Sequence, residues 1–384
     1  MAAVVSPRTE RQSWTSHNTS IPEVLEQLGR LQVQTRPDKE GMPEQPHPRG
    51  MVLNLIVVAP SPQASRRAVA LMDSLAGHHP FRGVVLSQGS DPGYPGIGAE
   101  VDVHTSALLD AVGVLYERVS LWGIGGDSEH LLNMADALLI DDLPTYVWWV
   151  GDPPLHEPWF RKAIANYHSL VVDSADFIHP GPGTTALSSL LDELGDGLGV
   201  SDMQWIRHRH WRELLAQVFN PPDRRGLLEG IDKVEIAYRR FSDSGPVPLL
   251  TGWLQSRLGW ALEQASTDPN GAIEVQYTSA AGRPITLILR PVQTESLPER
   301  DLVALRVSTE IPDQKLKLSA WRAREELGRI HVQTVTAGGK VDQLRLVDLA
   351  ERGELLLGCL MSRGRDPIYR QALKCAAELL VAVR

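Results

Sequence analysis

The sequence predicts an α/β protein of two domains, a Rossmann-like domain with a mostly parallel sheet and flanking helices, followed by an α+β domain with an antiparallel sheet. The length of 384 residues exceeds what one ordinary hydrophobic core organises. Strand-like runs alternate with helical runs between residues 51 and 219, whereas strand-like runs follow one another through turns after residue 223. We therefore expect the two halves to have different sheets.

The first half is predicted to be Rossmann-like because its strands are separated by helices. Alternation of this kind requires crossover connections, which place the strands parallel and cover both faces of the sheet with helices. We expect strands at 52–59, 83–87, 100–104, 118–122, 145–149 and 169–172, and helices at 63–76, 127–139, 184–194 and 210–219.

The second half begins where Asn220-Pro221-Pro222-Asp223 must end a helix, because proline blocks helix propagation and restricts the residue before it. Turns such as Ala281-Gly282-Arg283 and Ala337-Gly338-Gly339 join consecutive strands as hairpins. We expect strands at 234–238, 273–277, 285–289, 302–308, 329–335 and 341–346, and helices at 248–264, 346–352 and 367–383.

The N-terminal region is expected to precede these domains without belonging to either core. Residues 1–20 are polar and show no periodic pattern, whereas Ile21, Val24, Leu25, Leu28 and Leu31 follow a helical spacing. The stretch that follows is rich in proline and polar residues. The expected organisation is a disordered tail at 1–20, a docking helix and linker at 21–50, the Rossmann-like domain at 51–222 and the α+β domain at 223–384.

Composition predicts a globular cytoplasmic protein that binds neither nucleic acid nor membranes. The net charge of −9 repels phosphate backbones, and the apolar runs are shorter than the roughly 20 residues of a membrane-spanning helix. The first 20 residues contain no apolar core of a secretory signal. Cys359 and Cys375 are too few for a disulfide framework.

Motifs for catalysis or cofactor binding are weak. The turn Gly123–Ser128 follows a predicted strand and opens a helix, where backbone N–H groups could hold an anion, but the glycine spacing of a dinucleotide loop is incomplete. It is either a tight turn or a nucleotide or sugar-phosphate site. His208 and His210 are two residues apart, which separates them around a helix and disfavours a metal site. We predict no catalytic residue, cofactor or metal ligand.

Tryptophan is the conspicuous residue type, with ten in the chain. Adjacent Trp148 and Trp149 must point to opposite faces of a strand, so both are covered only if both faces are packed or one meets a partner. Trp253 and Trp260, seven residues apart, are predicted to share one helix face with Arg257 between them, and tryptophan with arginine is the composition of interface hot spots. The alternatives are core packing or partner binding, and the candidate partner-binding residues are Trp148, Trp149, Asp152, Trp253, Arg257 and Trp260.

Several segments of the chain, taken together, resemble those of a known family. They are Leu143–Pro154, Val172–Phe177, Trp211–Ala216 leading to Pro221-Pro222, Leu250–Trp260, Asn54–Ala59, His79–Arg82 and Arg365–Tyr369 with Ala372-Leu373. In order and spacing they are similar to the glucose-6-phosphate dehydrogenase assembly protein (OpcA) family, from about Ile21 to the C-terminus. The resemblance implies glucose-6-phosphate dehydrogenase as the partner and thioredoxin-linked control through cysteine in cyanobacterial relatives. Cys375 falls on a predicted apolar face, which disfavours a reactive thiol.

Two functions follow from these observations. The resemblance implies a non-catalytic assembly factor or allosteric activator of glucose-6-phosphate dehydrogenase, supporting the oxidative pentose phosphate pathway. The alternative is a nucleotide or sugar-phosphate binding sensor or enzyme that uses the Gly123–Ser128 turn. Ligand-induced thermal stabilisation would distinguish the second from the first.

Overall fold

The computed structural model describes residues 8–34, 50–75, 80–88, 96–108, 111–123, 128–240, 248–294, 297, 301–312, 314–323, 326–347, 351–362 and 364–383. The chain forms two compact units, residues 1–172 with 196–201 and residues 173–195 with 202–384. The predicted boundary at residue 222 therefore lies within the second unit. The reason is that the helix before the boundary buries Trp211, Leu215 and Phe219 in the core of the second sheet.

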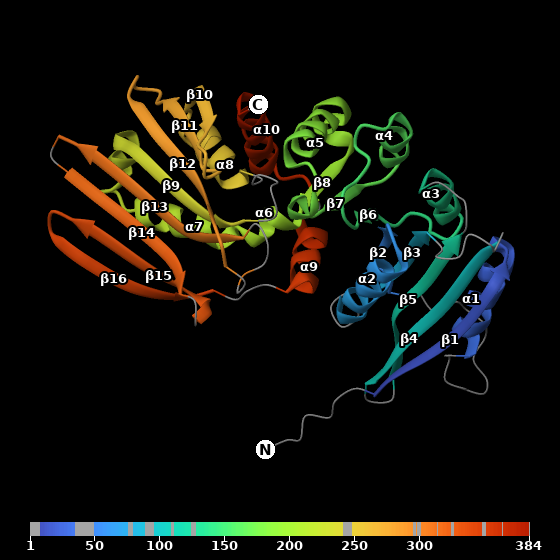
Figure 1. The fold of residues 1–384 in the computed structure, drawn as a ribbon. Helices are drawn as coiled ribbons and strands as arrows, with labels where there is room; N and C mark the ends of the chain where they lie inside the picture. Colours follow the sequence, from blue (N-terminus) through green and yellow to red (C-terminus); the bar gives the residue numbers. More distant parts are fainter. Residues whose placement is uncertain are drawn as a thin grey trace, which may run out of the picture. The chain divides into compact units, whose positions relative to one another are not determined.

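The first unit is built on a mixed eight-stranded sheet with the order β1-β4-β5-β3-β2-β6-β7-β8 (Figure 1). The pairs β3–β5, β2–β3, β2–β6 and β6–β7 are parallel, whereas β1–β4 and β4–β5 are antiparallel. Its strands are β1 Arg8–Thr19, β2 Leu53–Ala59, β3 Phe81–Gln88, β4 Ile97–Leu108, β5 Ala111–Gly123, β6 Thr145–Trp149, β7 Ser169–Val172 and β8 Gly199–Asp202. Its helices are α1 Ile21–Gln34, α2 Pro62–Leu75, α3 Ser128–Asp136 and α4 Pro158–Ile164.

The central strands of this sheet are buried on both faces. Every residue of β2 and of β6 is buried, which includes the adjacent Trp148 and Trp149. Their burial follows the pattern of parallel strands in α/β proteins, which read as continuous apolar runs because helices cover both faces. The prediction of a largely parallel sheet is confirmed for this part of the chain.

The start of the chain differs from the predicted disordered tail, because residues 8–19 form strand β1 against β4. Arg11 Nε donates to Asp102 Oδ1 at 2.6 Å, and its Nη2 donates to Glu100 Oε1 at 2.6 Å. Asp102 is fully buried and also pairs with Arg118. A polar strand can therefore dock without a periodic apolar pattern, since ladder hydrogen bonds and ion pairs hold it.

Helix α1 follows β1 and confirms the predicted docking helix. Val24, Leu28 and Leu31 are buried, as their helical spacing predicts, whereas Leu25 is 41% exposed and lies outside the buried face. Gln32 Nε2 donates to Glu117 Oε1 at 2.8 Å, and Glu117 in turn accepts from Arg82. The linker predicted to complete residues 21–50 falls mostly on residues 35–49, which lie outside the described residues.

The second unit is built on another eight-stranded sheet, with the order β10-β11-β12-β9-β13-β14-β15-β16. It is antiparallel except for the pair β12–β9, so the predicted antiparallel sheet is confirmed in the main. Its strands are β9 Ile231–Arg239, β10 Ala261–Thr267, β11 Ile273–Thr278, β12 Pro284–Val292, β13 Leu302–Ile311, β14 Gln314–Ala323, β15 Glu326–Thr336 and β16 Gly339–Leu346. Its helices are η1 Ser174–Asp176, α5 Pro180–Leu194, α6 Met203–Arg207, α7 Arg209–Phe219, η3 Arg225–Gly230, α8 Leu249–Leu258, α9 Arg352–Ser362 and α10 Pro367–Ala382.

Two helix predictions in this unit are wrong in extent. The helix expected over 248–264 ends at Leu258, because Gly259 adopts a left-handed conformation with φ of 64°, and β10 follows. The helix expected at 346–352 is instead α9, which begins only at Arg352. Strand β14 has no counterpart among the predicted strands.

Helix α8 packs closely against α10, and one glycine permits the contact (Figure 1). A Cβ added to Gly252 would lie 2.1 Å from the Ala372 carbonyl oxygen and 2.8 Å from the Ala376 nitrogen. Both atoms belong to the backbone, so neither can move away as a flexible side chain would. The packing of α8 therefore depends on the absence of a side chain at this position.

No helix in the described part of the chain is both long enough and apolar enough to cross a membrane.

We predict that deleting residues 1–20 lowers the melting temperature, because the deletion unpairs β4 and removes Arg11 from the buried Asp102 carboxylate. Arg11→Ala alone is expected to cost about 1 kcal/mol, since half-exposed ion pairs contribute little. Arg30→Ala, at an exposed position of α1, serves as the matched control and should be neutral. A deletion variant that melts like the parent would show that β1 contributes nothing to stability.

We predict that Gly252→Ala lowers the free energy of unfolding by about 1–3 kcal/mol, because the new methyl group clashes with the α10 backbone. Alanine otherwise favours a helix interior over glycine by about 1 kcal/mol. Gly29→Ala in α1, where a Cβ meets nothing within 4 Å, is the control and should not destabilise. Equal behaviour of the two variants in urea unfolding would contradict the close α8–α10 packing.

Candidate functional site

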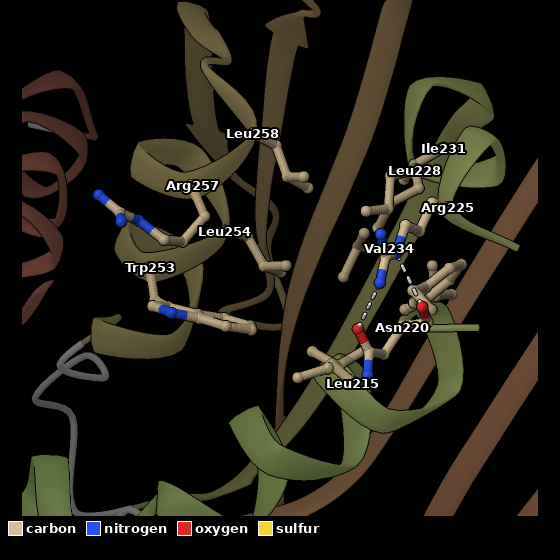
Figure 2. Close-up of a pocket in the computed structure, with 13 residues that line it drawn as sticks. Leu215, Asn220, Arg225, Leu228, Ile231, Val234, Trp253, Leu254, Arg257 and Leu258 are labelled. Carbon is tan, nitrogen blue, oxygen red and sulfur yellow. Dashed lines mark hydrogen bonds between the residues drawn. The ribbon is translucent and has the colours of Figure 1, made fainter. Parts of the chain in front are cut away.

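A surface pocket of about 360 Å³ in the second unit is the strongest candidate site among the described residues. Figure 2 shows it between α8 on one side and the α7, η3 and β9 segments on the other. Its lining residues are Leu215, Ala216, Phe219, Asn220, Arg225, Leu228, Ile231, Val234, Trp253, Leu254, Arg257, Leu258 and Val307. A volume of this size lies within the range of natural ligand sites.

The pocket is an opening of the hydrophobic core to the surface. Leu215, Val234 and Val307 belong to the core cluster of the second sheet, and they form part of the lining. Leu228 and Trp253 pack against that cluster and are only partly buried. Apolar surface is thus exposed where α7 and α8 do not close over the sheet, and covering it would be favourable.

Two arginines provide the charge of this pocket. Arg225 is oriented by Asn220, because its Nε donates to the Asn220 carbonyl oxygen at 2.8 Å and its Nη2 donates to Asn220 Oδ1 at 3.3 Å. Arg257 donates through Nη2 to Gln371 Oε1 on α10. Both guanidinium groups are exposed, and neither forms an ion pair with a carboxylate in the described part of the chain.

The candidate residues on and after α8 separate into two environments. Trp253 and Arg257, four residues apart on α8, both line the pocket, as Figure 2 shows. Trp260 lies beyond the end of the helix and is buried against Tyr277, with ring centroids 5.7 Å apart. The expected helical face of Trp253, Arg257 and Trp260 is therefore reduced to its first two members, because Gly259 turns the chain.

The other three candidates belong to the first unit. Trp148 and Trp149 are 3% and 6% exposed, so the structure places them in the core rather than on a partner-binding surface. Trp149 packs edge to face on Phe160, with ring centroids 5.1 Å apart. Asp152 lies after β6 and is half-buried. Of the six residues, the structure brings only Trp253 and Arg257 together at a pocket.

The turn of the alternative hypothesis lies largely outside the described residues. Residues 124–127 are not described. Strand β5 ends at Gly123, one residue beyond the predicted strand, and α3 begins at Ser128, one residue after the predicted helix start. His208 is buried beside Gln204, and burial lowers its pKa well below the ordinary value, so it is neutral. The described residues contain no group of three or more His, Cys, Asp and Glu side chains that could hold a metal ion.

A buried pair of carboxylates has the perturbed ionisation that often marks an active site. Burial would raise the pKa of Asp173, but the Arg207 guanidinium, 2.8 Å from Oδ2, holds it below the ordinary value. Burial, together with the charge of Asp173, raises the pKa of Asp202 to about 6.

The hydrogen bonds of these carboxylates indicate a structural role. Asp202 Oδ1 accepts from Ser174 N at 3.0 Å and from Gln204 N at 2.9 Å, which caps helix α6. Asp202 Oδ2 accepts from the Tyr369 hydroxyl at 3.3 Å. Because both oxygens are occupied by donors of the same chain, this carboxylate holds helix ends together rather than facing a substrate.

Neither cysteine has the features of a reactive thiol. Cys359 is fully buried, and burial raises its pKa well above the ordinary value. Cys375 is half-buried, and burial raises its pKa to about 11. Reactive cysteines require a lowered pKa, because the thiolate is the nucleophile. The expectation that Cys375 is a poor redox switch agrees with this environment.

Sequence reasoning missed the wall of the pocket opposite α8. Arg225 and Leu228 come from η3, a short 3₁₀ helix directly after the Pro221-Pro222 pair, which the sequence marks as a domain boundary. The residues of β9 and β13 resemble ordinary strand positions. No local signal marks such residues, because the pocket exists only where separate elements approach one another.

The fold and the pocket together define a mixed α/β protein with two compact units and an apolar, arginine-flanked surface pocket. Two family models match the chain. One describes the N-terminal domain of a glucose-6-phosphate dehydrogenase subunit and matches residues 72–189, and the other describes the corresponding C-terminal domain and matches residues 198–373. The chain belongs to the glucose-6-phosphate dehydrogenase assembly protein (OpcA) family.

Two relatives support this assignment. The putative OxPP cycle protein OpcA of Synechococcus elongatus is 29% identical over 351 residues, which cover 88% of this chain and 71% of that protein. The protein of the same description from Nostoc punctiforme is 26% identical over 321 residues, which cover 80% and 67%. Among solved structures, the 3-ketoreductase KijD10 from Actinomadura kijaniata has a TM-score of 0.47 at 13% identity, covering 87% of this chain and 97% of that one.

We predict that Asp202→Asn stabilises the protein at pH 7.5 more than at pH 4.5. The pKa of Asp202 is 3.8 in the unfolded chain and about 6 in the folded protein. Between these pH values the folded protein keeps a proton on Asp202 that the unfolded chain releases. The stability that protonated Asp202 contributes is therefore lost as the pH rises through this window. Asparagine keeps the capping acceptor without the charge, and the gain at pH 7.5 is expected to be up to about 3 kcal/mol.

The measurement is urea unfolding of parent and variant at both pH values. Asp202→Ala is the control, because it removes the cap of α6 and should destabilise at either pH. A gain for Asp202→Asn that does not depend on pH would contradict the raised pKa.

Proposed function

We propose that this protein is a non-catalytic assembly factor and allosteric activator of glucose-6-phosphate dehydrogenase that supports the oxidative pentose phosphate pathway. The observation that carries the proposal is the match of two family models, both described as domains of a glucose-6-phosphate dehydrogenase subunit, in chain order over residues 72–189 and 198–373. The relatives described as OxPP cycle proteins point to the same pathway.

We interpret the first unit as Rossmann-like. Its strand order β5-β3-β2-β6-β7-β8 begins at β2 in the middle of the sheet and continues outward on both sides. In such sheets a dinucleotide lies at the carboxyl end of the first strand, where a glycine-rich turn presents backbone N–H groups to the pyrophosphate. In this chain β2 is followed by Pro60-Ser61-Pro62, and proline has no N–H group to offer. This difference favours a non-catalytic role over a dinucleotide-dependent one.

The nucleotide or sugar-phosphate alternative has less support. The Gly123–Ser128 turn follows β5, which is two strands away from β2 in the sheet, on the side opposite β6. The point where the strand order reverses, at which ligands bind in open α/β sheets, lies between β2 and β6. A phosphate ligand at the turn would therefore use an unusual place in this fold.

Partner binding through the α8 face agrees with the chemistry of the pocket. Trp253 offers a half-buried aromatic surface, and Arg257 offers an exposed guanidinium one helical turn away. Tryptophan and arginine are the residues most enriched at hot spots of protein interfaces. An assembly factor needs such a surface, whereas it needs no catalytic constellation.

We predict that the purified protein co-purifies with its cognate glucose-6-phosphate dehydrogenase, raises its specific activity and shifts it to a larger species in size-exclusion chromatography. Arg257→Glu is expected to weaken activation by about tenfold or more, because it opposes the docking of a matched partner surface. Arg290→Glu is the matched control and should activate like the parent, since Arg290 is an exposed arginine on β12 that does not line the pocket.

Substantial NADP reduction or phosphate hydrolysis by the isolated protein, lost on Ser128→Ala, would favour the sensor or enzyme alternative. Absence of any complex with the dehydrogenase under conditions where both proteins are folded would refute the proposed function.

A further inference from the structure

The pocket in the second unit carries positive charge for which the described part of the protein provides no carboxylate partner. The chain has a net charge of −9, yet the charged residues that line the pocket are Arg225 and Arg257. Elsewhere in the described structure, Arg207 pairs with Asp173 and Arg82 with Glu117, whereas Arg212, stacked on Trp205, forms no ion pair there. Arg225 and Arg257 likewise have no carboxylate partner among the described residues, and beside an apolar pocket they are available to an acidic ligand from outside.

Arg225 and Arg257 belong to opposite walls of the pocket. Figure 2 shows Arg225 on the side formed by η3 and β9, and Arg257 with Trp253 on the α8 side. The guanidinium group of Arg257 points away from the space between the walls and donates to Gln371 on α10. Asn220 accepts two hydrogen bonds from Arg225, which fix the plane of the guanidinium group. They leave the Nη1 atom of Arg225 without a partner among the described residues. A guanidinium held in this way loses little conformational entropy when a carboxylate binds.

The space between the arginines is apolar. It is bounded by Leu254 and Leu258 from α8 and by Leu215, Leu228 and Ile231 from the opposite side. A volume of about 360 Å³ is large enough to hold several water molecules. Water over such a surface is poorly hydrogen-bonded, so an apolar group that displaces it gains affinity.

We propose that this pocket binds a segment of the dehydrogenase in which one large apolar side chain, aromatic or leucine-like, is flanked on both sides by Asp or Glu. The apolar side chain fills the space beside Trp253, one carboxylate pairs with Arg225 at the pocket, and the other pairs with Arg257 on the outer side of α8. This inference rests on the proposed function, which supplies the partner, and it adds the chemistry by which that partner is recognised.

Charge complementarity favours an acidic peptide segment over other occupants of the pocket. A basic or neutral segment would leave both arginines at the margin of a closed interface without counter-charges, which is costly when they lose water. Because Arg225 and Arg257 belong to opposite walls and the Arg257 guanidinium lies outside the space between them, two separate carboxylates fit this arrangement better than the single carboxylate of a small apolar acid.

The test uses purified cognate dehydrogenase as the probe and measures its affinity for variants of the full chain. Ala216→Trp places a large side chain into the pocket from an exposed position of α7, and Gln217→Trp, the next residue on α7 and not part of the lining, is its matched control. Arg225→Glu and Arg257→Glu test the charges, with Arg290→Glu as control. Melting temperatures establish that each variant is folded.

The expected result is a loss of affinity of about 30-fold or more for Ala216→Trp and of about tenfold or more for each pocket charge reversal, with the controls like the parent. Affinity of the parent should fall between about 0.05 M and about 0.5 M salt, and this dependence should be smaller in the Arg225→Glu, Arg257→Glu double variant.

The failures are distinguishable. If the parent does not bind the dehydrogenase, the proposed function and this inference both fall. If the parent binds and the folded Ala216→Trp variant binds equally well, the pocket inference alone is overturned. If Ala216→Trp weakens binding but Arg225→Glu and Arg257→Glu do not, the pocket binds the dehydrogenase without acidic side chains, and the proposed acidic segment is wrong. Stabilisation of the parent by decanoate, with dehydrogenase binding unaffected by Ala216→Trp, would instead assign the pocket to a small apolar acid.

Discussion

The contact between the backbones of α8 and α10 at Gly252 is the constraint on which the candidate site depends. The Ala372 carbonyl oxygen occupies the space where any other residue would place its Cβ. This close approach holds α8 over the sheet, so that Trp253 and Arg257 form one wall of the pocket while η3 and α7 form the other. Because the position of α8 is set by this backbone contact, the helix that carries one wall is held in place before any partner binds, and a pre-organised site loses less entropy on association.

Charge in this protein is used in two different ways. In the core of each unit, acids and arginines neutralise one another, as Asp102 does with Arg11 and Arg118 in the first and Asp173 with Arg207 in the second. Such groups have strongly perturbed environments, yet their hydrogen bonds are directed to strands and helix ends. At the pocket the pattern is reversed, because the arginines are exposed and lack acidic partners among the described residues. Perturbed ionisation therefore marks the internal scaffold here, and unmatched charge marks the surface that can bind.

The tryptophans show how the same residue type serves both purposes. In β6 the neighbours Trp148 and Trp149 are covered on both faces of a sheet that is packed on both sides. On α8 Trp253 is only half covered, because α7 does not close against it. The difference lies in what surrounds each side chain and not in the segment that carries it. An assembly role agrees with this arrangement, since most of the large aromatic surface stabilises the fold and a small remainder is left for a partner.

The sequence by itself determined the change from alternating elements to consecutive strands, the helices α1, α7 and α10, and the pairing of Trp253 with Arg257 on one helix. These features depend on spacing within a single segment, which periodicity reveals. Only the tertiary structure decided the end of α8 at Gly259, the docking of β1 on Asp102, the burial of Trp260 and the placement of Arg225 and Arg257 at one pocket. Each of these depends on residues far apart in the chain or on a backbone conformation that glycine permits without requiring it, and no local pattern encodes which distant surfaces will come together.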